Sequence, residues 1–216
     1  MPEGIQTVAK FITDYGLMIL ISAIFIYVVI KFIGIGFKFL ETKFTTKRHD
    51  QMLDIRSEIN KQVQRLITSE LRKSDATRIH VIEFSNSVMS VAYLPFKYMT
   101  CTYEVHKLGV SSTGHKIDKL STSLFTPFFT ELNEHEYCIF NIDDPHTTMG
   151  GAMCDLMEAQ DEHQALCVAM KTPRGKHIGY VEMIKEDEFT GTDIDDMQHL
   201  SQQISALLSI AESKQN

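Results

Sequence analysis

Apolar residues follow two different patterns along this chain. From Tyr15 to Phe37 they form a nearly continuous run whose only charged residue is Lys31. At about 1.5 Å of rise per residue, a helix of this length spans the roughly 30 Å hydrocarbon layer of a bilayer. The start of the chain lacks the basic region and cleavage site of a signal peptide. The pattern therefore predicts an uncleaved transmembrane helix over residues 15–40, after an N-terminal tail over residues 1–14.

The next segment, residues 41–76, is polar with one narrow apolar stripe. Its apolar residues recur at intervals of three and four, the spacing of an amphipathic helix, and they are Met52, Ile55, Ile59, Val63 and Leu66. The stripe is too short to predict an autonomous coiled coil. Two interpretations remain open: the helix packs on the domain that follows, or it contacts a second copy of the chain.

The pattern changes to alternation at Arg78, which opens a globular domain over residues 77–216. Strands are predicted at residues 78–84, 99–105 and 137–142, with a polar insert at residues 85–96 between the first two. Helices are predicted at residues 117–132, bent at Pro127, and at about residues 152–159. The phenylalanines of residues 117–132 are expected to belong to the core.

The clearest local signal is a hairpin. Two alternating apolar strands within residues 164–185 are joined by a Pro- and Gly-containing turn at residues 172–176. A closing amphipathic helix follows, with Thr192 as the expected N-cap and acidic residues in its first turn. Together these elements predict an α+β fold, in which helices flank an antiparallel sheet.

The distribution of charge limits the partners and suggests an orientation. The net charge of −7 and the lack of a basic stripe with aromatics argue against nucleic acid binding. After the apolar run, however, basic residues accumulate at Lys38, Lys43, Lys47 and Arg48, against Lys10 before it. By the positive-inside rule, this asymmetry places the C-terminal domain in the cytoplasm.

Candidate chemistry is sparse. The cysteines, Cys101, Cys138, Cys154 and Cys167, lack a CxxC spacing, and three of them are expected to be core residues. The histidines singled out, His106, His115, His135, His146, His163, His177 and His199, lack the spacing of metal ligands. A cluster formed by Asp143, Asp144 and His146 near residues 134–136 is explained equally well as a solvated loop. No catalytic motif is recognisable. We therefore expect no enzymatic activity, no metal and no cofactor.

Small residues in the apolar run are the candidate contacts between transmembrane helices. They are Ser22, Ala23, Gly34 and Gly36, and such residues allow two helices to approach closely. Their spacing is not the four-residue repeat of a tight dimer, so an equally good interpretation is that they face lipid.

The C-terminal third resembles the end of a GAF domain. The resemblance rests on the hairpin with its Pro-Arg-Gly turn, the following Phe-Thr-x-x-Asp step and the closing helix, over residues 164–212. Residues 78–161 agree with GAF and PAS folds in the order of their elements. The resemblance implies a GAF/PAS-like sheet flanked by helices, a fold common in sensors.

The whole layout also resembles the single-span holins of T-even-type tailed phages. The segments that carry this likeness are residues 81–105, VIEFSNSVMSVAYLPFKYMTCTYEV, and the strand GYVEMIK with its closing helix. The resemblance implies a lysis protein of the host inner membrane whose domain lies in the periplasm, where an antiholin could bind it. In the periplasm the cysteines could also form disulfides. This location conflicts with the flanking charges, so the side of the membrane stays open.

Two functions follow as hypotheses. The first is a single-pass, holin-like protein that self-associates in the lipid bilayer of the host inner membrane, forms lesions there and has an antiholin as a possible regulator. The alternative is a membrane-anchored GAF/PAS-like sensor or scaffold, which binds a small ligand or a protein partner and transmits through the helix after the span.

Overall fold

The computed structural model describes the backbone of residues 3–85, 96–144 and 151–213. Side chains between residues 36 and 52, and some others in the first helix and at the end of the last, lie outside this description. The chain divides into two compact units, Met1–Asp54 and Ile55–Asn216. Helix α1 (Glu3–Lys73) begins in the first unit and ends in the second.

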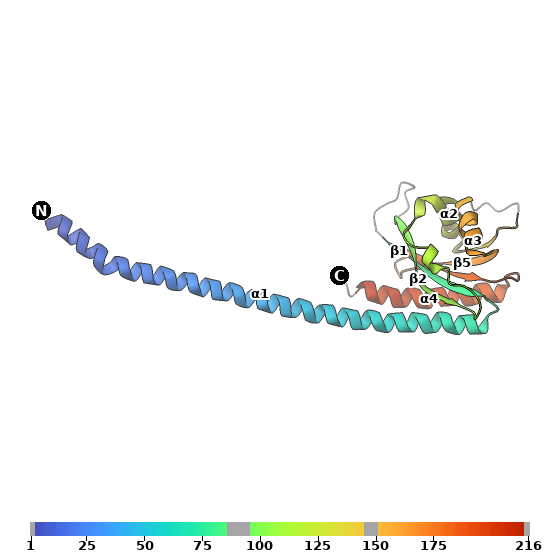
Figure 1. Cartoon of the computed structure of the whole chain (residues 1–216), viewed down its shortest axis with the longest axis horizontal. Coiled ribbons are helices and arrows are strands. Elements are labelled where there is room, and N and C mark those ends of the chain that lie inside the picture. Colours follow the sequence, from blue (N-terminus) through green and yellow to red (C-terminus); the bar gives the residue numbers. More distant parts are fainter. Residues whose placement is uncertain (1–2, 86–95, 145–150, 214–216) are drawn as a thin grey trace. The chain divides into compact units, whose positions relative to one another are not determined.

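The second unit is built on one sheet of six strands (Figure 1). The strands are β1 (Arg78–Ser85), β2 (Tyr98–His106), β3 (Leu120–Ser121), β4 (Tyr137–Asn141), β5 (Gln164–Lys171) and β6 (His177–Ile184). Their order across the sheet is β3-β2-β1-β6-β5-β4, and all neighbours pair antiparallel. The pairing of β1 with β6 joins the beginning of the domain to its end and places β1 in the middle of the sheet.

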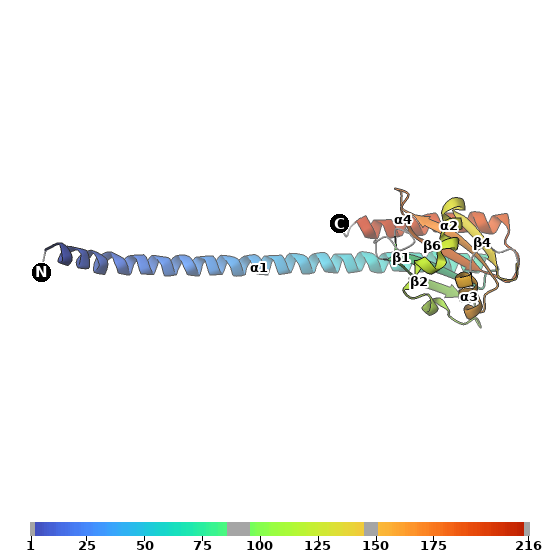
Figure 2. The same ribbon diagram turned by 90° about the horizontal axis from the view of Figure 1, so that it is seen from above.

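Two apolar layers form because side chains of a strand alternate between its two faces. On one face, the end of α1 and α4 (Gly191–Ser213) pack against the sheet. Their cluster includes Ile59, Val63, Ile67 and Leu71 from α1, Ile79 and Val81 from β1, and Met197, Leu200 and Ile204 from α4. Figures 1 and 2 show α4 beside the end of α1 in both views. These helices therefore share one face of the sheet.

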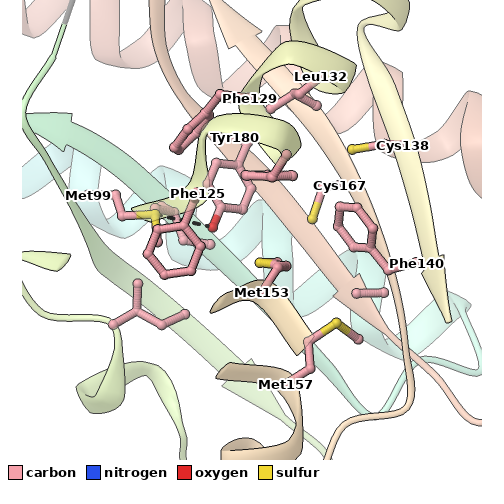
Figure 3. Close-up of a cluster of buried hydrophobic side chains, with 14 of the residues drawn as sticks. Met99, Phe125, Phe129, Leu132, Cys138, Phe140, Met153, Met157, Cys167 and Tyr180 are labelled. Atoms are coloured by element: carbon pink, nitrogen blue, oxygen red, sulfur yellow. Dashed lines mark hydrogen bonds between the residues drawn. The ribbon is translucent and has the colours of Figure 1, made fainter. Parts of the chain in front are cut away.

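The opposite face carries α2 (Thr126–His135) and α3 (Gly151–Gln160). Its buried cluster is aromatic and sulfur-rich, and it includes Met99, Phe129, Phe140, Met153, Met157, Cys167 and Tyr180, which Figure 3 labels, together with Phe128. The rings meet mostly edge to face, as in the pair Phe128 and Tyr180, whose centroids are 5.1 Å apart. The prediction that the phenylalanines of residues 117–132 belong to the core is right for Phe125, Phe128 and Phe129.

The helix predicted for residues 117–132 is wrong in its first half. Those residues form strand β3 and the 3₁₀ turn Thr122–Phe125, and a second 3₁₀ turn, Gly114–Lys116, precedes them. Helix α2 begins only at Thr126, which places Pro127 in its first turn. Proline fits there because the amide N–H that it lacks would have no partner in a first turn. Pro127 thus starts a helix and does not bend one.

The closing helix begins near its predicted position but with a different cap. The Thr190 hydroxyl accepts a hydrogen bond from the Asp193 amide at 3.3 Å, and the Asp193 carboxylate accepts one from the Thr190 amide at 2.7 Å. This reciprocal pair satisfies two amides of the helix start, in the manner of a capping box. Thr190 therefore takes the role that was predicted for Thr192.

The structure places the predicted transmembrane helix, residues 15–40, and the predicted amphipathic helix, residues 41–76, largely within the single helix α1. In the part of the chain that the structure describes, no helix is both long enough and apolar enough to cross a membrane. The span predicted for residues 15–40 is therefore not found there. What the structure does record is that the large apolar side chains described between Tyr15 and Ile35 are exposed.

Candidate functional site

Three neighbouring strands carry one ionisable residue each at the same level of the sheet. His80 of β1 lies directly opposite Glu104 of β2 on one side and Glu182 of β6 on the other. Beyond Glu182, the same row continues with Cys167 of β5 and Cys138 of β4. Because opposite residues of antiparallel strands face the same side of the sheet, the register alone brings the imidazole between two carboxylates.

The imidazole of His80 is fully buried and contacts both carboxylates. Its Nδ1 lies 2.9 Å from Glu182 Oε2, and its Nε2 lies 3.5 Å from Glu104 Oε1 and 3.3 Å from Thr113 Oγ1. Glu182 is itself only 2% exposed, and its other oxygen accepts a hydrogen bond from the Cys167 thiol at 3.6 Å. Both ring nitrogens of His80 therefore have an acceptor within reach, which suits the doubly protonated imidazolium.

The ionisation of these groups follows from their contacts. Burial lowers the pKa of His80, but the hydrogen bonds to Glu104 and Glu182 and the charges of Glu182 and Glu162 outweigh it and raise the pKa to about 9. Burial likewise raises the pKa of Glu104, but hydrogen bonds from His80, Ser112 and Thr113 hold that pKa well below its usual range. At neutral pH the centre of the row is therefore an imidazolium beside ionised Glu104.

The carboxylate of Glu104 also fixes the segment that follows β2. It accepts hydrogen bonds from the Ser112 hydroxyl at 2.5 Å, the Thr113 amide at 2.8 Å and the Gly114 amide at 3.2 Å. A Cβ atom added to Gly114 would lie 2.8 Å from Cys101 Sγ and 2.9 Å from Glu104 Oε2. A side chain at this position would therefore have to displace the Cys101 thiol and the Glu104 carboxylate, whereas glycine lets the backbone pass this close to the carboxylate.

A second ion pair lies beside the first and is linked to it through a hydroxyl. The guanidinium of Arg78 donates to Glu162 Oε1 at 2.7 Å and to the Ser111 carbonyl at 3.0 Å. The Thr113 hydroxyl, which lies against His80, donates to the same oxygen of Glu162 at 3.2 Å. Burial and the charge of Glu182 raise the pKa of Glu162 to about 7, although the charges of His80 and Arg78 and the hydrogen bond from Arg78 act to lower it. The ion pair of Arg78 with Glu162 thus connects the α3–β5 connection to the start of β1.

We call these residues, Arg78, His80, Glu104, Thr113, Glu162 and Glu182, the buried network. The thiols near it are not activated, because burial raises the pKa of Cys101 to about 12 and that of Cys138 and Cys167 well above the usual value. All four cysteines are free. The network therefore consists of charged groups that hold β2, β6 and the α3–β5 connection to β1. None of its side chains is a reactive nucleophile.

Most of the predicted contact residues of the amphipathic helix lie against the sheet. Ile59 and Val63 are buried in the cluster of α1, α4 and the sheet, and Ile55 and Leu66 pack against its rim. In the apolar segment, Ser22 and Gly34 are exposed. The side chains of Met52, Ala23 and Gly36 lie outside the described residues.

The predicted acidic and histidine-containing loop does not become a site. His163 Nδ1 lies 3.2 Å from Asp143 Oδ2, both side chains are largely exposed, and His146 falls outside the described residues. Within residues 3–85, 96–144 and 151–213, no three His, Cys, Asp or Glu side chains are placed to hold a metal ion. The polar insert predicted at residues 85–96 lies mostly outside the described residues too.

The buried network was missed by the sequence analysis, although a signal for it exists. In each of the strands RIHVIEF, MTCTYEV and GYVEMIK an ionisable residue stands between two apolar neighbours: His80, Glu104 and Glu182, with Glu83 as a second one in the first strand. Such a residue on a strand buried on both faces requires a partner. Noticing one such residue in each of three strands would have suggested a buried ionic row, but only the strand order shows that they meet.

Comparison with known proteins identifies the fold. No protein-family model and no curated protein matches the chain. Among solved structures, the PixJ GAF domain from Thermosynechococcus elongatus has a TM-score of 0.55 at 13% identity, covering 74% of this chain and 91% of its own. The GAF domain of a sensor histidine kinase from Bacillus halodurans has a TM-score of 0.54 at 10% identity, with 72% and 97% covered.

The GAF domain/HD domain protein from Geobacter sulfurreducens is similar to the same extent. Its TM-score is 0.52 at 14% identity, and the match covers 72% of this chain and 93% of that one. These neighbours support the GAF part of the predicted resemblance, and nothing in the comparisons supports the resemblance to holins. At such low identity the likeness establishes the fold alone. The chain therefore contains a domain with the GAF fold.

Proposed function

We propose that this chain is a regulatory protein of the GAF type, in which β1 transmits the state of the buried network to α1. One observation carries the proposal: β1 contributes to both faces of the sheet at adjacent positions. His80 lies in the network, while Ile79 and Val81 pack in the same cluster as Ile67 of α1. A change in the ion pairs of His80 would shift the strand on which α1 rests. Two neighbours are described as a sensor histidine kinase and a cyanobacteriochrome receptor, which supports a sensory role.

The input to this domain is proposed to be a small ligand or a protein partner, not a tetrapyrrole. Two neighbours are described with bound biliverdin IXa and phycocyanobilin. In this chain the space between the sheet and helices α2 and α3 holds large side chains with at most 2% exposure. They are Phe129, Phe140, Met153, Met157 and Tyr180, labelled in Figure 3, and Phe128. A tetrapyrrole placed there would have to displace several of them, so these residues do not fit such a group.

We further propose that lipid covers the apolar segment of α1 between Tyr15 and Ile35. Every side chain from Phe25 to Ile30 is a large hydrophobic one and is between 38% and 68% exposed. Six consecutive residues cover the full circumference of a helix, whereas a protein partner would require only one apolar stripe. Exposed apolar surface of this extent is rare in proteins surrounded by water. A bilayer would cover it on all sides, consistent with the sequence of residues 15–37.

Expression of the full chain in a bacterial host separates this proposal from a holin. Viability and membrane potential are followed over time for the wild type and for Val28→Lys, and the membranes are extracted with alkaline carbonate. A regulatory protein leaves growth and membrane potential intact. Wild-type protein stays with the extracted membranes, and Val28→Lys weakens this attachment because a charge in the apolar layer is costly.

Two other outcomes contradict parts of the proposal. An abrupt collapse of membrane potential at a fixed time, abolished by Val28→Lys, would establish lesion formation and favour the holin. Complete release of the wild-type chain by carbonate would show that lipid does not hold residues 15–35.

A further inference from the structure

One flank of α1 presents a row of cations in a protein of net charge −7. Lys61, Arg65 and Arg72 are exposed there, and none of them has an ion pair with another described residue. The row lines a hollow of about 580 Å³ together with Gln64, Thr68, Ser69 and Lys73. We call these seven residues the cationic groove. Three unpaired cations along about three turns of helix favour an anionic partner.

The groove continues onto the end of β2. A second hollow, of about 820 Å³, shares Thr68 and Arg72 with the first, and its lining includes the basic residues His106 and Lys107, the acidic residues Asp75 and Glu104, and Leu108. Leu108 is fully exposed, at 104% of its reference area. The charges of this second hollow are therefore mixed, so the groove on α1 is the cationic part, and a partner that reaches beyond it would meet the uncovered side chain of Leu108.

Exposed acidic side chains cluster where β6 connects to α4. Glu186, Asp187 and Glu188 lie in that connection, and Asp195 and Asp196 lie in the first turns of α4. All five are exposed, and no ion pair joins them to another residue in the described part of the chain. They contrast with Asp193 beside them, whose carboxylate is paired with Lys185 at 2.7 Å. We call these five residues the acidic loop.

The two charged surfaces lie at the same end of the sheet. Arg78, at the start of β1, pairs with His106 at the end of β2 and with Ile184 at the end of β6. The groove therefore lies on the β2 side of this end, and the acidic loop follows β6 on the other side of β1. Adjacent surfaces of opposite charge are complementary to themselves when a second molecule is rotated by 180°.

We propose that the cationic groove binds the acidic loop of a second copy of this chain. The partner is identified by charge: the unpaired cations of one copy match the unpaired carboxylates of another. Exposed ion pairs are weak individually, so several must act together, and the contact is expected to weaken with salt because charges are screened within about 10 Å at 0.1 M ionic strength. This inference does not depend on the proposed regulatory function.

Sedimentation velocity of the full chain in a non-ionic detergent tests the proposal. The groove variant carries Arg65→Glu and Arg72→Glu, and the loop variant carries Asp187→Lys and Glu188→Lys. A matched control carries Lys97→Glu and Arg174→Glu, two exposed cations away from the groove. Each protein is measured at about 50 mM and about 500 mM salt, a range over which screening becomes much stronger.

We expect the wild type and the control to self-associate more at low salt. The groove variant and the loop variant should each associate on the order of tenfold more weakly, because two ion pairs become repulsive in each. An equimolar mixture of the two variants should recover association, since the reversed groove of one then matches the reversed loop of the other. Association through the apolar segment would be insensitive to salt and equal in all variants.

Three results would overturn the proposal. The variants could associate as strongly as the wild type, or the mixture could fail to recover association. Alternatively, the groove variant could lose binding to vesicles of phosphatidylglycerol while the loop variant self-associates normally, which would assign the groove to an anionic lipid surface. Circular dichroism of each variant confirms that the fold is retained before these results are interpreted.

Discussion

The two faces of the sheet in this domain are built from different chemistry. The face covered by α1 and α4 is held by apolar side chains, among them Ile67, Val81 and Ile204. The face covered by α2 and α3 combines an aromatic cluster with the buried network around His80. Apolar packing alone suffices to hold a helix on a sheet. The charges therefore do something other than attach a helix. They fix two connecting segments, the one after β2 that holds Thr113 and the one between α3 and β5 that holds Glu162.

The difference also has an energetic meaning. Apolar burial is nearly independent of pH and tolerates some rearrangement, whereas a buried ion pair depends on both partners and on their protonation. Because β1 belongs to both faces, the proposed transmission from the network to α1 needs only this one strand.

The largest effect is expected when one charge of the buried network is removed. Glu182→Gln leaves the imidazolium of His80 with only one carboxylate in a buried place, and losing one partner of a buried pair typically costs about 3–5 kcal/mol. Urea denaturation at pH 7 measures the free energy of unfolding. Glu134→Gln, on the exposed face of α2, is the control and should change little. A loss of less than about 1 kcal/mol for Glu182→Gln would contradict the account of the network.

Truncation of a side chain on the apolar face should lower the free energy of unfolding nearly as much as Glu182→Gln, but this loss should not depend on pH. Ile67 is fully buried between α1 and the sheet, and Ile67→Ala is expected to lower the free energy of unfolding by about 2–5 kcal/mol. Since no charge is involved, the loss should be the same at pH 6 and at pH 9. A loss that varied strongly with pH would show that the two faces are less distinct than described.

The pH dependence of stability should come from the network face. The pKa of His80 rises from 6.5 to about 9 on folding, so the folded state holds its proton more tightly. The resulting stabilisation is fully present below pH 6.5 and is lost as the pH rises through 9, in total about 3 kcal/mol at most. Thermal or urea unfolding between pH 6 and 9.5 measures this loss. In His80→Gln the decline should be much smaller, and an unchanged decline would assign it to other groups.

The smallest effect is expected at an exposed ion pair. Lys171 Nζ lies 2.8 Å from Glu136 Oε1 at the rim of the domain, where Glu136 is largely exposed. Lys171→Met should change the free energy of unfolding by about 0–1 kcal/mol, because solvent and salt screen such a pair. Unfolding at low and high salt measures this. A cost comparable to that of Glu182→Gln would mean that burial is not what distinguishes the network.

Local elements of this domain are predictable from sequence, because their signals are local. The hairpin β5–β6, strand β1 and helix α4 follow from alternation, turn residues and helical spacing. Residues 117–125 were mispredicted as helix because their apolar spacing fits a helix by chance. Tertiary contacts decided otherwise: the Thr122 hydroxyl donates to the Phe96 carbonyl, and β3 pairs with β2.

The candidate site was not predictable to the same degree. His80, Glu104 and Glu182 lie far apart in the chain, and their contact depends on β1 lying between β2 and β6. That strand order is a property of the complete fold, so no spacing rule contains it. The histidines considered as metal ligands from the sequence did not include His80. Among them, His163 lies beside Asp143 at the surface.

Amide hydrogen exchange of α1 between Ile55 and Lys73 tests the central claim most directly. The account predicts that Glu182→Gln accelerates exchange in this part of α1, although Glu182 lies on the opposite face, because β1 carries the disturbance to Ile79 and Val81. Leu124→Ala, at a largely exposed position on the network side of the sheet, should leave α1 unchanged. If Glu182→Gln accelerated exchange only in β1, β2 and β6 and left α1 as in the wild type, transmission through β1 would be contradicted.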